Sequence, residues 1–303
     1  MSGRYGGSTL VAAALMVLMW GSSPVATKIG LASYQPGQWT LLRFLVTSAA
    51  MLVIAVVTRL RPPRREDILP MIGLGMIGIS VNQLCFSFAM QHVDAGTATF
   101  LVATVPVMTA ILARVVLQER LTPAGWAGIG LTVAGTAVLV LGQGRNLSFT
   151  AGALTLLLGA FSEAIYYIFQ KPMLRKYGSS EVSAWTLIAS TIPLLIFLPG
   201  FLAQAPVAAP AHTWLGVYAG LGAGVIGYLC MTVTNARMPA SASAVLMALL
   251  PPVALLFSWW WLGTVPPALS IAGGAVSLAG VLLVTLRGRA SAPAGEIALA
   301  PPD

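Results

Sequence analysis

Residues 9–30, TLVAAALMVLMWGSSPVATKIG, form an apolar stretch with a single charged side chain, Lys28, near its end. About 20 mostly apolar residues are enough for a helix to cross the hydrocarbon core of a bilayer. Similar stretches follow at 37–58, 68–90, 95–117, 123–142, 150–171, 182–204, 213–236, 239–262 and 267–286. Transmembrane β-strands are shorter and alternate in polarity, so these long runs favour helices. The sequence therefore predicts an all-α integral membrane protein with ten transmembrane helices.

The composition excludes most soluble classes of protein. Of the 303 residues, 57% are hydrophobic and 8% are charged, whereas about 25% are charged in an average soluble domain. Disordered chains need low hydrophobicity and high charge, and two cysteines cannot make a disulfide scaffold. A net charge of +8 would suggest nucleic acid in a soluble protein, but in a membrane protein it marks cytoplasmic loops. We expect no nucleic-acid partner, no cofactor and no metal cluster.

The positive charges predict the orientation in the membrane. With a cytoplasmic N-terminus, two cations, Lys28 and Arg145, lie at outer ends, and thirteen lie in inner segments. The thirteen are Arg4, Arg59, Arg61, Arg64, Arg65, Arg114, Arg120, Lys171, Arg175, Lys176, Arg237, Arg287 and Arg289. Such an excess is typical of cytoplasmic loops. Both termini are therefore expected in the cytoplasm, the C-terminal one as a disordered tail over 290–303.

The second half of the chain repeats the first. With a shift of 145 residues, 75–141 aligns with 220–286 without a gap and with 13 identities in 67 positions, and Pro106 meets Pro251. Glycine and cysteine positions also match, which makes the repeat more convincing than apolar identities alone.

The number of spans in each repeat sets the architecture. A shift of 143 aligns the earlier spans and brings Trp20 opposite Glu163. We expect five-helix repeats over 1–145 and 146–289, and because five is odd the two must be inverted relative to each other. Inverted repeats are typical of secondary transporters, with a substrate site near the midplane at the repeat interface.

Short motifs accompany the repeat. They are Leu18-Met19-Trp20-Gly21-Ser22-Ser23, Leu42-Arg43-Phe44, Asp94-Ala95-Gly96-Thr97-Ala98 with Pro106, Leu117-Gln118-Glu119-Arg120-Leu121-Thr122, the Gly-rich run from Gly125 to Leu141, Pro239-Ala240-Ser241-Ala242 and Pro251-Pro252. Together they resemble the drug/metabolite transporter superfamily in its EamA branch. The second copy departs from that pattern at Leu262-Gly263-Thr264, where a Glu is usual.

The resemblance implies ten helices in two EamA repeats and a multi-pass protein of a bacterial-type inner membrane. Family members move amino acids, other metabolites, nucleotide sugars and drugs, and those with this layout include amino-acid exporters, among them an aromatic amino-acid exporter. From this we predict a transporter that exports amino acids, aromatic ones included, and related metabolites by alternating access. The alternatives are a drug or other metabolite transporter, uptake instead of export, or a non-transporting receptor.

An intramembrane enzyme is the least favoured alternative. Its catalytic set would have to lie at membrane depth, whereas the two histidines, His92 and His212, fall at predicted outer edges and no acid dyad is evident. Proton coupling, facilitated diffusion and the oligomeric state stay open.

Glu163 is the leading candidate for a transport residue. It lies near the middle of span 150–171, where an acidic side chain is costly and therefore indicates function. It is predicted to bind a substrate ammonium group or a proton. Tyr166 and Tyr167 lie three and four residues on and share its helical face. Trp20, near the middle of span 9–30, is expected to line the same cavity and to stack on flat or apolar substrates.

Other polar side chains at membrane depth complete the predicted substrate site. Asn82 and Gln83 lie in span 68–90, and Tyr228 and Thr232 lie in span 213–236. Buried amides must find hydrogen-bond partners, so these residues either face a wet cavity or join helices together. The repeat sets Tyr228 opposite Gln83 at mirrored depth.

Three further features concern movement and packing. Pro106 and Pro251 are repeat equivalents inside spans, so paired bends that act as hinges are expected there. The glycines over 128–135 and 273–280 are expected to pack helices closely. Arg43, inside span 37–58, is expected to pair with a carbonyl or carboxylate, or to form an outer gate with Lys28 or attract anions.

Overall fold

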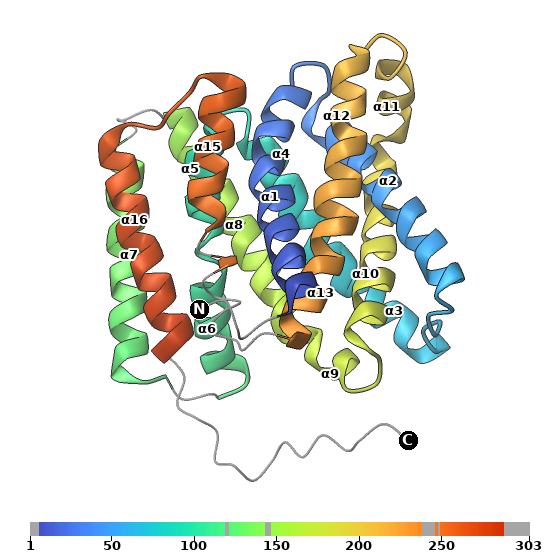
Figure 1. Cartoon of the computed structure of the whole chain (residues 1–303), viewed down its shortest axis with the longest axis horizontal. Helices are drawn as coiled ribbons and strands as arrows, with labels where there is room; N and C mark the ends of the chain where they lie inside the picture. Colours follow the sequence, from blue (N-terminus) through green and yellow to red (C-terminus); the bar gives the residue numbers. More distant parts are fainter. Residues whose placement is uncertain (1–5, 119–120, 143–146, 238–245, 248, 288–303) are drawn as a thin grey trace.

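The computed structural model describes residues 6–118, 121–142, 147–237, 246–247 and 249–287, and over these residues the chain is a bundle of helices joined by short loops (Figure 1). Within the described part, nine helices or runs of helices are long and apolar enough to cross a membrane, and Leu250–Leu262 is a shorter apolar helix. Each of the ten predicted spans thus corresponds to a helix or a run of helices. The prediction of a ten-helix membrane protein is confirmed.

The first five crossings are α1 (Gly7–Gly30), α2 (Pro36–Val57), the run of α3 (Arg65–Leu74), η1 (Gly75–Ser80) and α4 (Val81–Ala89), the pair α5 (Ala95–Val102) and α6 (Val105–Val116), and α7 (Pro123–Gly142).

The second five begin with α8 (Leu147–Phe169) and the single turn α9 (Lys171–Leu174). They continue with α10 (Ser179–Leu194), η2 (Leu195–Phe197) and α11 (Leu198–Gln204), then α12 (Pro210–Leu221), η3 (Gly222–Gly227) and α13 (Tyr228–Arg237), then α15 (Leu250–Leu262) and α16 (Ala268–Arg287). Most of the stretch 239–249 and the predicted tail over 290–303 lie outside the described residues.

The predicted bend in the fourth crossing is a break in the helix. α5 ends at Val102 and α6 starts at Val105, with Pro106 in its first turn. Proline suits this position because the first-turn N–H has no partner within a helix. Pro251 likewise lies in the first turn of α15. That these two positions act as hinges stays a prediction.

Two π-helical segments, η1 and η3, interrupt the third and eighth crossings. The shift of 145 that relates the repeats places η1 within two residues of η3. Side chains from elsewhere in the bundle bond to their carbonyl groups: the Ser162 hydroxyl to that of Ile77 in η1, and the Trp20 indole to that of Ala223 in η3. π-helical turns are rare and occur often at functional sites. The sequence analysis did not predict either segment.

The most extensive contact between described helices joins α7 to α16, one from each repeat. A Cβ atom on Gly128 would lie 2.8 Å from the carbonyl oxygen of Gly280, and one on Gly135 would lie 2.7 Å from that of Gly273. A shift of 145 turns Gly128 into Gly273 and Gly135 into Gly280, so each of these two contacts is the repeat equivalent of the other. Thr132 Oγ1 donates to the carbonyl oxygen of its own repeat equivalent, Ser277, at 3.3 Å. The predicted packing of the glycine faces is confirmed, and the contacts are those of a two-fold relation between antiparallel helices.

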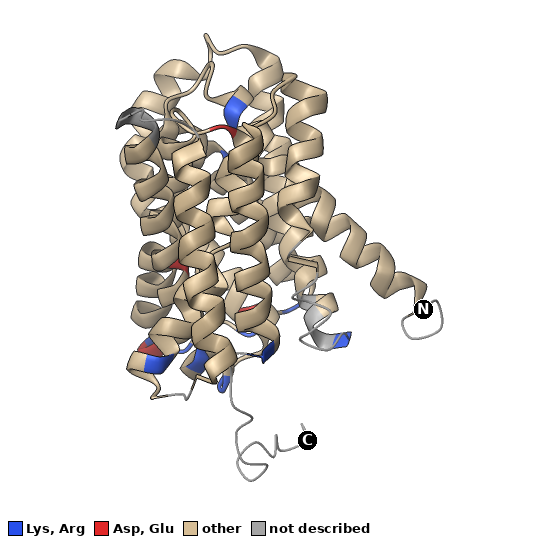
Figure 2. Ribbon diagram, turned by 90° about the vertical axis from the view of Figure 1, so that its left-hand side faces the viewer, with Lys and Arg blue, Asp and Glu red and all other residues tan. Residues whose placement is uncertain are grey.

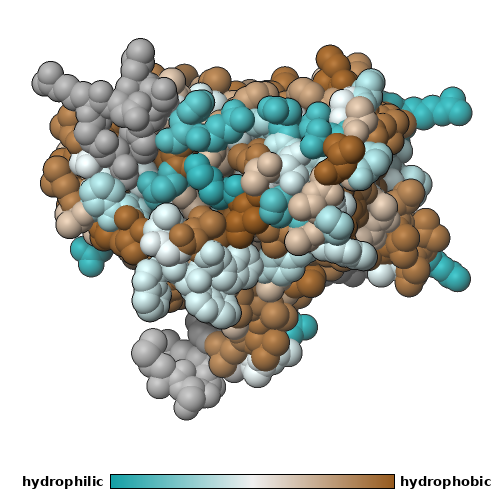
Figure 3. All heavy atoms as spheres, turned by 90° about the horizontal axis from the view of Figure 1, so that it is seen from above, coloured by the Kyte–Doolittle hydropathy of each residue, from teal (hydrophilic) through white to brown (hydrophobic). Residues whose placement is uncertain are grey.

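The outer surface of the bundle is apolar, and the charges gather at one end. Large hydrophobic side chains such as Val57 and Leu69 are exposed, which suits a surface that faces lipid. Figure 2 shows Lys and Arg concentrated at the end that the loop charges assign to the cytoplasm. Figure 3 shows the opposite end from above, with hydrophilic residues across the middle of this face and hydrophobic residues along much of its rim.

A buried acid joins the two repeats at the cytoplasmic end. Asp67, in the first turn of α3, accepts hydrogen bonds from Lys176 Nζ at 2.6 Å and from the Tyr177 hydroxyl at 2.7 Å. That hydroxyl in turn accepts from the backbone N–H of Arg64 at 2.9 Å. The hydrogen bond to Asp67 raises the pKa of Lys176 above its usual value. The loop after α2 is thereby held against the loop before α10.

The close packing of α7 on α16 predicts the effect of one added methyl group. Gly135→Ala should lower the thermal stability, because its Cβ would overlap the backbone of Ser277; overpacking of this kind costs about 1–3 kcal/mol. Gly130→Ala, on the same helix with nothing within 4 Å of the added Cβ, should leave stability unchanged or raise it, because alanine favours helices. Thermal unfolding of both variants in detergent measures the difference, and equal melting temperatures would contradict the packing.

Candidate functional site

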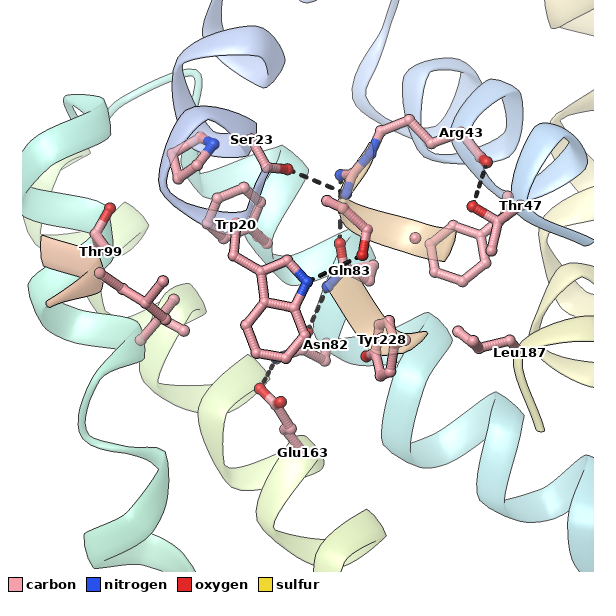
Figure 4. Close-up of a pocket in the computed structure, with 17 residues that line it drawn as sticks. Trp20, Ser23, Arg43, Thr47, Asn82, Gln83, Thr99, Glu163, Leu187 and Tyr228 are labelled. Atoms are coloured by element: carbon pink, nitrogen blue, oxygen red, sulfur yellow. Dashed lines mark hydrogen bonds between the residues drawn. The ribbon is translucent and has the colours of Figure 1, made fainter. Parts of the chain in front are cut away.

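One cavity lies where the two repeats face each other (Figure 4). Its walls come from α1, α2, α4 and α5 of the first repeat and from α8, α10, η3, α13 and α15 of the second. The lining residues are Trp20, Ser23, Pro24, Arg43, Phe44, Thr47, Asn82, Gln83, Phe86, Thr99, Val102, Glu163, Leu187, Ala223, Gly224, Tyr228 and Leu250. This is the place where inverted-repeat transporters hold their substrates.

Repeat-equivalent residues meet in this cavity. Trp20 and Glu163 correspond under the shift of 143, and Gln83 and Tyr228 correspond under the shift of 145. All four line the cavity. The relation between the repeats therefore brings equivalent positions to one site, and the two repeats present different side chains there.

A chain of hydrogen-bonded side chains runs across the cavity wall. Arg43 Nη1 donates to Gln83 Oε1 at 3.3 Å, and Gln83 Nε2 donates to Asn82 Oδ1 at 3.0 Å. Asn82 Nδ2 donates to Glu163 Oε2 at 3.3 Å, and the Tyr167 hydroxyl donates to Glu163 Oε1 at 3.2 Å. The chain links α2, α4 and α8, so a buried guanidinium and a half-buried carboxylate are connected through two amides.

Asn82 is the most firmly held member of this chain. Its Nδ2 also donates to the carbonyl oxygen of Gly159 at 2.9 Å, and its side chain is buried. A Cβ on Gly159 would lie 3.2 Å from the Asn82 carbonyl oxygen. The close approach of α8 to α4 at this glycine thus fixes the amide that contacts Glu163.

An aromatic pair forms another part of the wall. Trp20 donates from Nε1 to the carbonyl oxygen of Ala223 at 2.9 Å, which ties α1 to η3. The Trp20 and Tyr228 rings meet edge to face, with centroids 5.5 Å apart and planes at 72°. Such pairs are favourable beyond the area that they bury. With Phe44 and Phe86 nearby in the lining, this wall suits an apolar or aromatic group.

Arg43 is buried at the side of the cavity that α2 contributes. Its side chain is 7% exposed, and it reaches Gln83 and, through Nη2, Ser23 Oγ at 3.4 Å. Its Nε has no hydrogen-bond partner. Both partners are neutral oxygen acceptors, and both distances exceed the usual 2.9–3.0 Å of an N–H···O bond.

The tyrosines after Glu163 take different positions. The Tyr167 hydroxyl donates to the carboxylate of Glu163. Tyr166 is buried, and its hydroxyl lies 3.1 Å from Thr186 Oγ1 of α10. Their rings meet edge to face at 5.7 Å. Tyr167 is therefore a partner of Glu163, whereas Tyr166 packs behind it, away from the cavity lining.

The structure brings together most of the residues predicted for substrate binding. Trp20, Asn82, Gln83, Glu163 and Tyr228 line the cavity, Tyr167 contacts Glu163, and Tyr166 lies in the adjoining core. The side chain of Thr232 lies outside the described part of the structure.

The predicted set left out several lining residues, among them Arg43, Ser23, Thr47 and Thr99. Arg43 had a signal, because it is the one charged residue inside span 37–58. The hydroxyl residues had none, because serine and threonine also bond their own helix backbone, as Thr99 does to the carbonyl oxygen of Ala95.

At the outer end, Lys28 joins α1 to the turn after α4. Its Nζ donates to the carbonyl oxygens of Met90 at 2.6 Å and Val93 at 3.1 Å. The ammonium group thus stays inside the bundle, where it is held by backbone carbonyl groups. Among the described residues, no group of three His, Cys, Asp or Glu side chains is placed to hold a metal ion.

Comparison with known proteins identifies the family. The EamA-like transporter family matches residues 7–141 and 150–286, two copies that together span most of the chain. This chain belongs to the EamA-like transporter family. It is accordingly a multi-pass membrane protein of the inner-membrane type, with a small molecule as its substrate.

Bacterial relatives align with nearly the whole chain. A probable terminal-alkyne amino-acid exporter of Streptantibioticus cattleyicolor is 38% identical over 90% of this chain and 92% of that protein. The uncharacterized transporter YdfC of Bacillus subtilis is 33% identical over 92% of this chain and 91% of that protein. A probable amino-acid metabolite efflux pump of Salmonella typhimurium is 28% identical over 89% and 92%, respectively.

A solved crystal structure shares the fold. It superposes with a TM-score of 0.63 and 20% sequence identity, and covers 93% of this chain and 98% of its own. At this identity the likeness concerns the fold of the EamA repeats.

The cavity predicts which side chains water reaches. In a protein whose two cysteines are replaced by alanine, Thr99→Cys, on the cavity wall, should react with a charged methanethiosulfonate reagent, because thiolates form where water enters. Thr97→Cys, on the same helix, is the matched control because Thr97 is fully buried and outside the lining. Burial disfavours the thiolate, so this cysteine should react at least roughly tenfold more slowly. Mass spectrometry measures both rates, and equal rates would contradict a wet cavity.

Proposed function

We propose that this protein is a secondary transporter that exports amino acids, aromatic ones included, and related small metabolites by alternating access. The observation that carries the proposal is the cavity between the repeats, with an apolar and aromatic wall and a carboxylate at one side. The names of the relatives from Streptantibioticus and Salmonella, an amino-acid exporter and an amino-acid metabolite efflux pump, support it. The protein moves its substrate unchanged, so no catalytic residue is assigned.

Glu163 is the proposed contact for the substrate's ammonium group. Its two oxygens already accept hydrogen bonds from Asn82 and Tyr167, so the carboxylate is oriented before a substrate arrives. A charge-assisted hydrogen bond is stronger than a neutral one, so this carboxylate suits an ammonium group. Trp20 and Tyr228 would hold the substrate's side chain, and Gln83 and Thr232 complete the proposed binding set.

The helix interruptions support movement of one part of the bundle against another. The break between α5 and α6, and the π-helical segments η1 and η3, all adjoin helices that line the cavity. In the proposed cycle, Pro106 and Pro251 serve as hinges. The Lys28 contacts at the outer end and the Asp67 contacts at the cytoplasmic end open in turn.

Coupling to protons follows if the same carboxylate serves two ligands. A Glu163 carboxylate that holds a substrate ammonium cannot hold a proton at the same time. Substrate would then leave on one side of the membrane as a proton arrives from that side, which gives antiport. An acid at membrane depth is the usual means of such an exchange.

Exchange of labelled substrate tests the proposed function directly. Proteoliposomes loaded with unlabelled amino acids, with and without a pH gradient, should accumulate labelled aromatic amino acids by counterflow. Empty liposomes and liposomes loaded with glucose are the controls. No counterflow for any amino acid would reject the substrate class and leave the fold and the family unaffected; cationic drugs and nucleosides would then be tested.

Replacement of Glu163 separates binding from coupling. Glu163→Gln keeps the size of the side chain and removes its charge, so uptake driven by a pH gradient should be lost and amino-acid binding should weaken about 10-fold or more, as for a lost charge-assisted hydrogen bond. Glu66→Gln, an exposed acid at the start of α3, is the matched control. If Glu163→Gln exchanged substrate normally with an unchanged pH dependence, Glu163 would not be the coupling residue.

A further inference from the structure

Arg43 is a buried cation without an acidic partner among the described residues. It is 93% buried (7% exposed), in the outer half of the hydrophobic helix α2. Glu66 and Asp67 pair with Arg64 and Lys176 at the cytoplasmic end. Glu163 is linked to Arg43 only through the side chains of Asn82 and Gln83. A guanidinium held in a membrane without a counter-charge is costly, so its presence there calls for an explanation.

The hydrogen bonds of Arg43 are incomplete. A guanidinium carries five N–H groups, and this one makes bonds of 3.3 Å to Gln83 Oε1 and 3.4 Å to Ser23 Oγ, whereas Nε has no partner. Both acceptors are neutral, and both distances are longer than usual. The Arg43 guanidinium can therefore donate to a stronger, negatively charged acceptor.

Arg43 is placed so that such an acceptor could lie in the cavity. Arg43 lines the cavity together with Ser23 and Gln83, and Figure 4 shows its guanidinium directed toward them from the α2 side. Glu163 lies beyond Asn82, at the other end of the hydrogen-bonded chain. The cavity thus offers a cation and an anion at separate positions along one wall.

We propose that Arg43 binds the carboxylate of the substrate, so that the cavity selects amino acids and other small organic monocarboxylates. The planar guanidinium presents pairs of N–H groups that match the two oxygens of a carboxylate. The inference rests on the proposed function in taking this cavity as the substrate site, and it names the group by which the substrate is recognised.

The lining favours a carboxylate over a phosphate. Arg43 is the one Lys or Arg among the described lining residues, and Lys28 is bonded to two backbone carbonyls at the outer end. One cation compensates a single negative charge. The rest of the lining around it, including Phe44, Phe86 and Leu187, suits the apolar remainder of a monoanion and would leave a dianion poorly solvated.

Ligands that differ by one functional group test the proposal on the purified protein in detergent. L-tryptophan, tryptamine and indole-3-propionate share one ring and one chain length, but tryptamine lacks the carboxylate and indole-3-propionate lacks the amine. L-norvaline, butylamine and pentanoate form the same series without the ring. Binding is measured by calorimetry and by the ligand-induced shift of the melting temperature.

In the wild-type protein we expect each amino acid to bind roughly 10- to 100-fold more tightly than its decarboxylated amine, as for a charged hydrogen bond. Arg43→Gln should weaken the amino acid and the carboxylic acid by that factor and leave the amine unchanged. Arg43→Lys, which keeps the charge and loses the paired N–H groups, should be intermediate. Glu163→Gln should weaken the amine and spare the carboxylic acid.

Arg175→Gln, the same substitution at an exposed cytoplasmic residue, is the control and should bind all ligands as the wild type does. If Arg43→Gln does not fold, the comparison of acid with amine in the wild type and in Arg43→Lys still decides the question. Equal affinity for amino acid and amine in the wild type, or an equal loss of both in an Arg43 variant, would overturn the proposal even if counterflow succeeds.

The outcomes separate this inference from the proposed function. Binding of indole-3-propionate or pentanoate that depends on Arg43, without exchange of any amino acid, would support carboxylate recognition and reject amino-acid export. Exchange of amino acids that does not depend on Arg43 would support amino-acid export and reject carboxylate recognition by Arg43. If no carboxylate of either series binds the wild-type protein, the inference is overturned.

Discussion

No bulk water reaches the hydrocarbon core of a bilayer, so every polar side chain at that depth must find its partners inside the bundle. In this protein the requirement is met by a chain from Arg43 through Gln83 and Asn82 to Glu163 and Tyr167. The chain binds α2, α4 and α8 to one another around a cavity. Packing of the other helices leaves this space unfilled, and the polar groups make it a place where a charged molecule can rest.

The two repeats supply the frame in which that space exists. The contact of α7 with α16 lies on the two-fold relation, with Thr132 bonded to its own equivalent Ser277. Contacts that lie on a two-fold axis between the repeats change little when the two repeats exchange conformations. The cavity, by contrast, has Trp20 where its partner repeat has Glu163, so the two halves present different chemistry to one substrate. Symmetry in the scaffold and asymmetry in the lining suit a protein that must offer the same site to both sides of a membrane.

The sequence predicts well those features that the bilayer requires, such as long apolar helices. It does not predict which of two neighbouring side chains on one helix faces the cavity. Long apolar runs and charge bias predicted the helices, and the glycine faces predicted close packing of α7 and of α16, although not that the two pack on each other. Polar and aromatic residues at mid-span predicted five of the lining residues, Trp20, Asn82, Gln83, Glu163 and Tyr228. Tyr166 follows Glu163 by three residues, a rotation of about 60° away from it on a helix of 3.6 residues per turn. That difference turns Tyr166 toward Thr186, whereas Tyr167 reaches the carboxylate. Periodicity alone could not separate them.

The π-helical segments have a consequence for how such sites diversify. A π-helical turn holds one more residue than the α-helical turn that it replaces. Removing that residue from η1 would therefore restore an ordinary helix and leave the facing of the residues beyond it unchanged. Asn82 and Gln83 lie shortly after η1, in α4, so both amides would still face the cavity, whereas the Ile77 carbonyl group that accepts from Ser162 would return to the helix ladder. A lineage can thus gain or lose such an interruption, and the contact it makes available, through a single insertion or deletion without turning the lining residues away from the cavity.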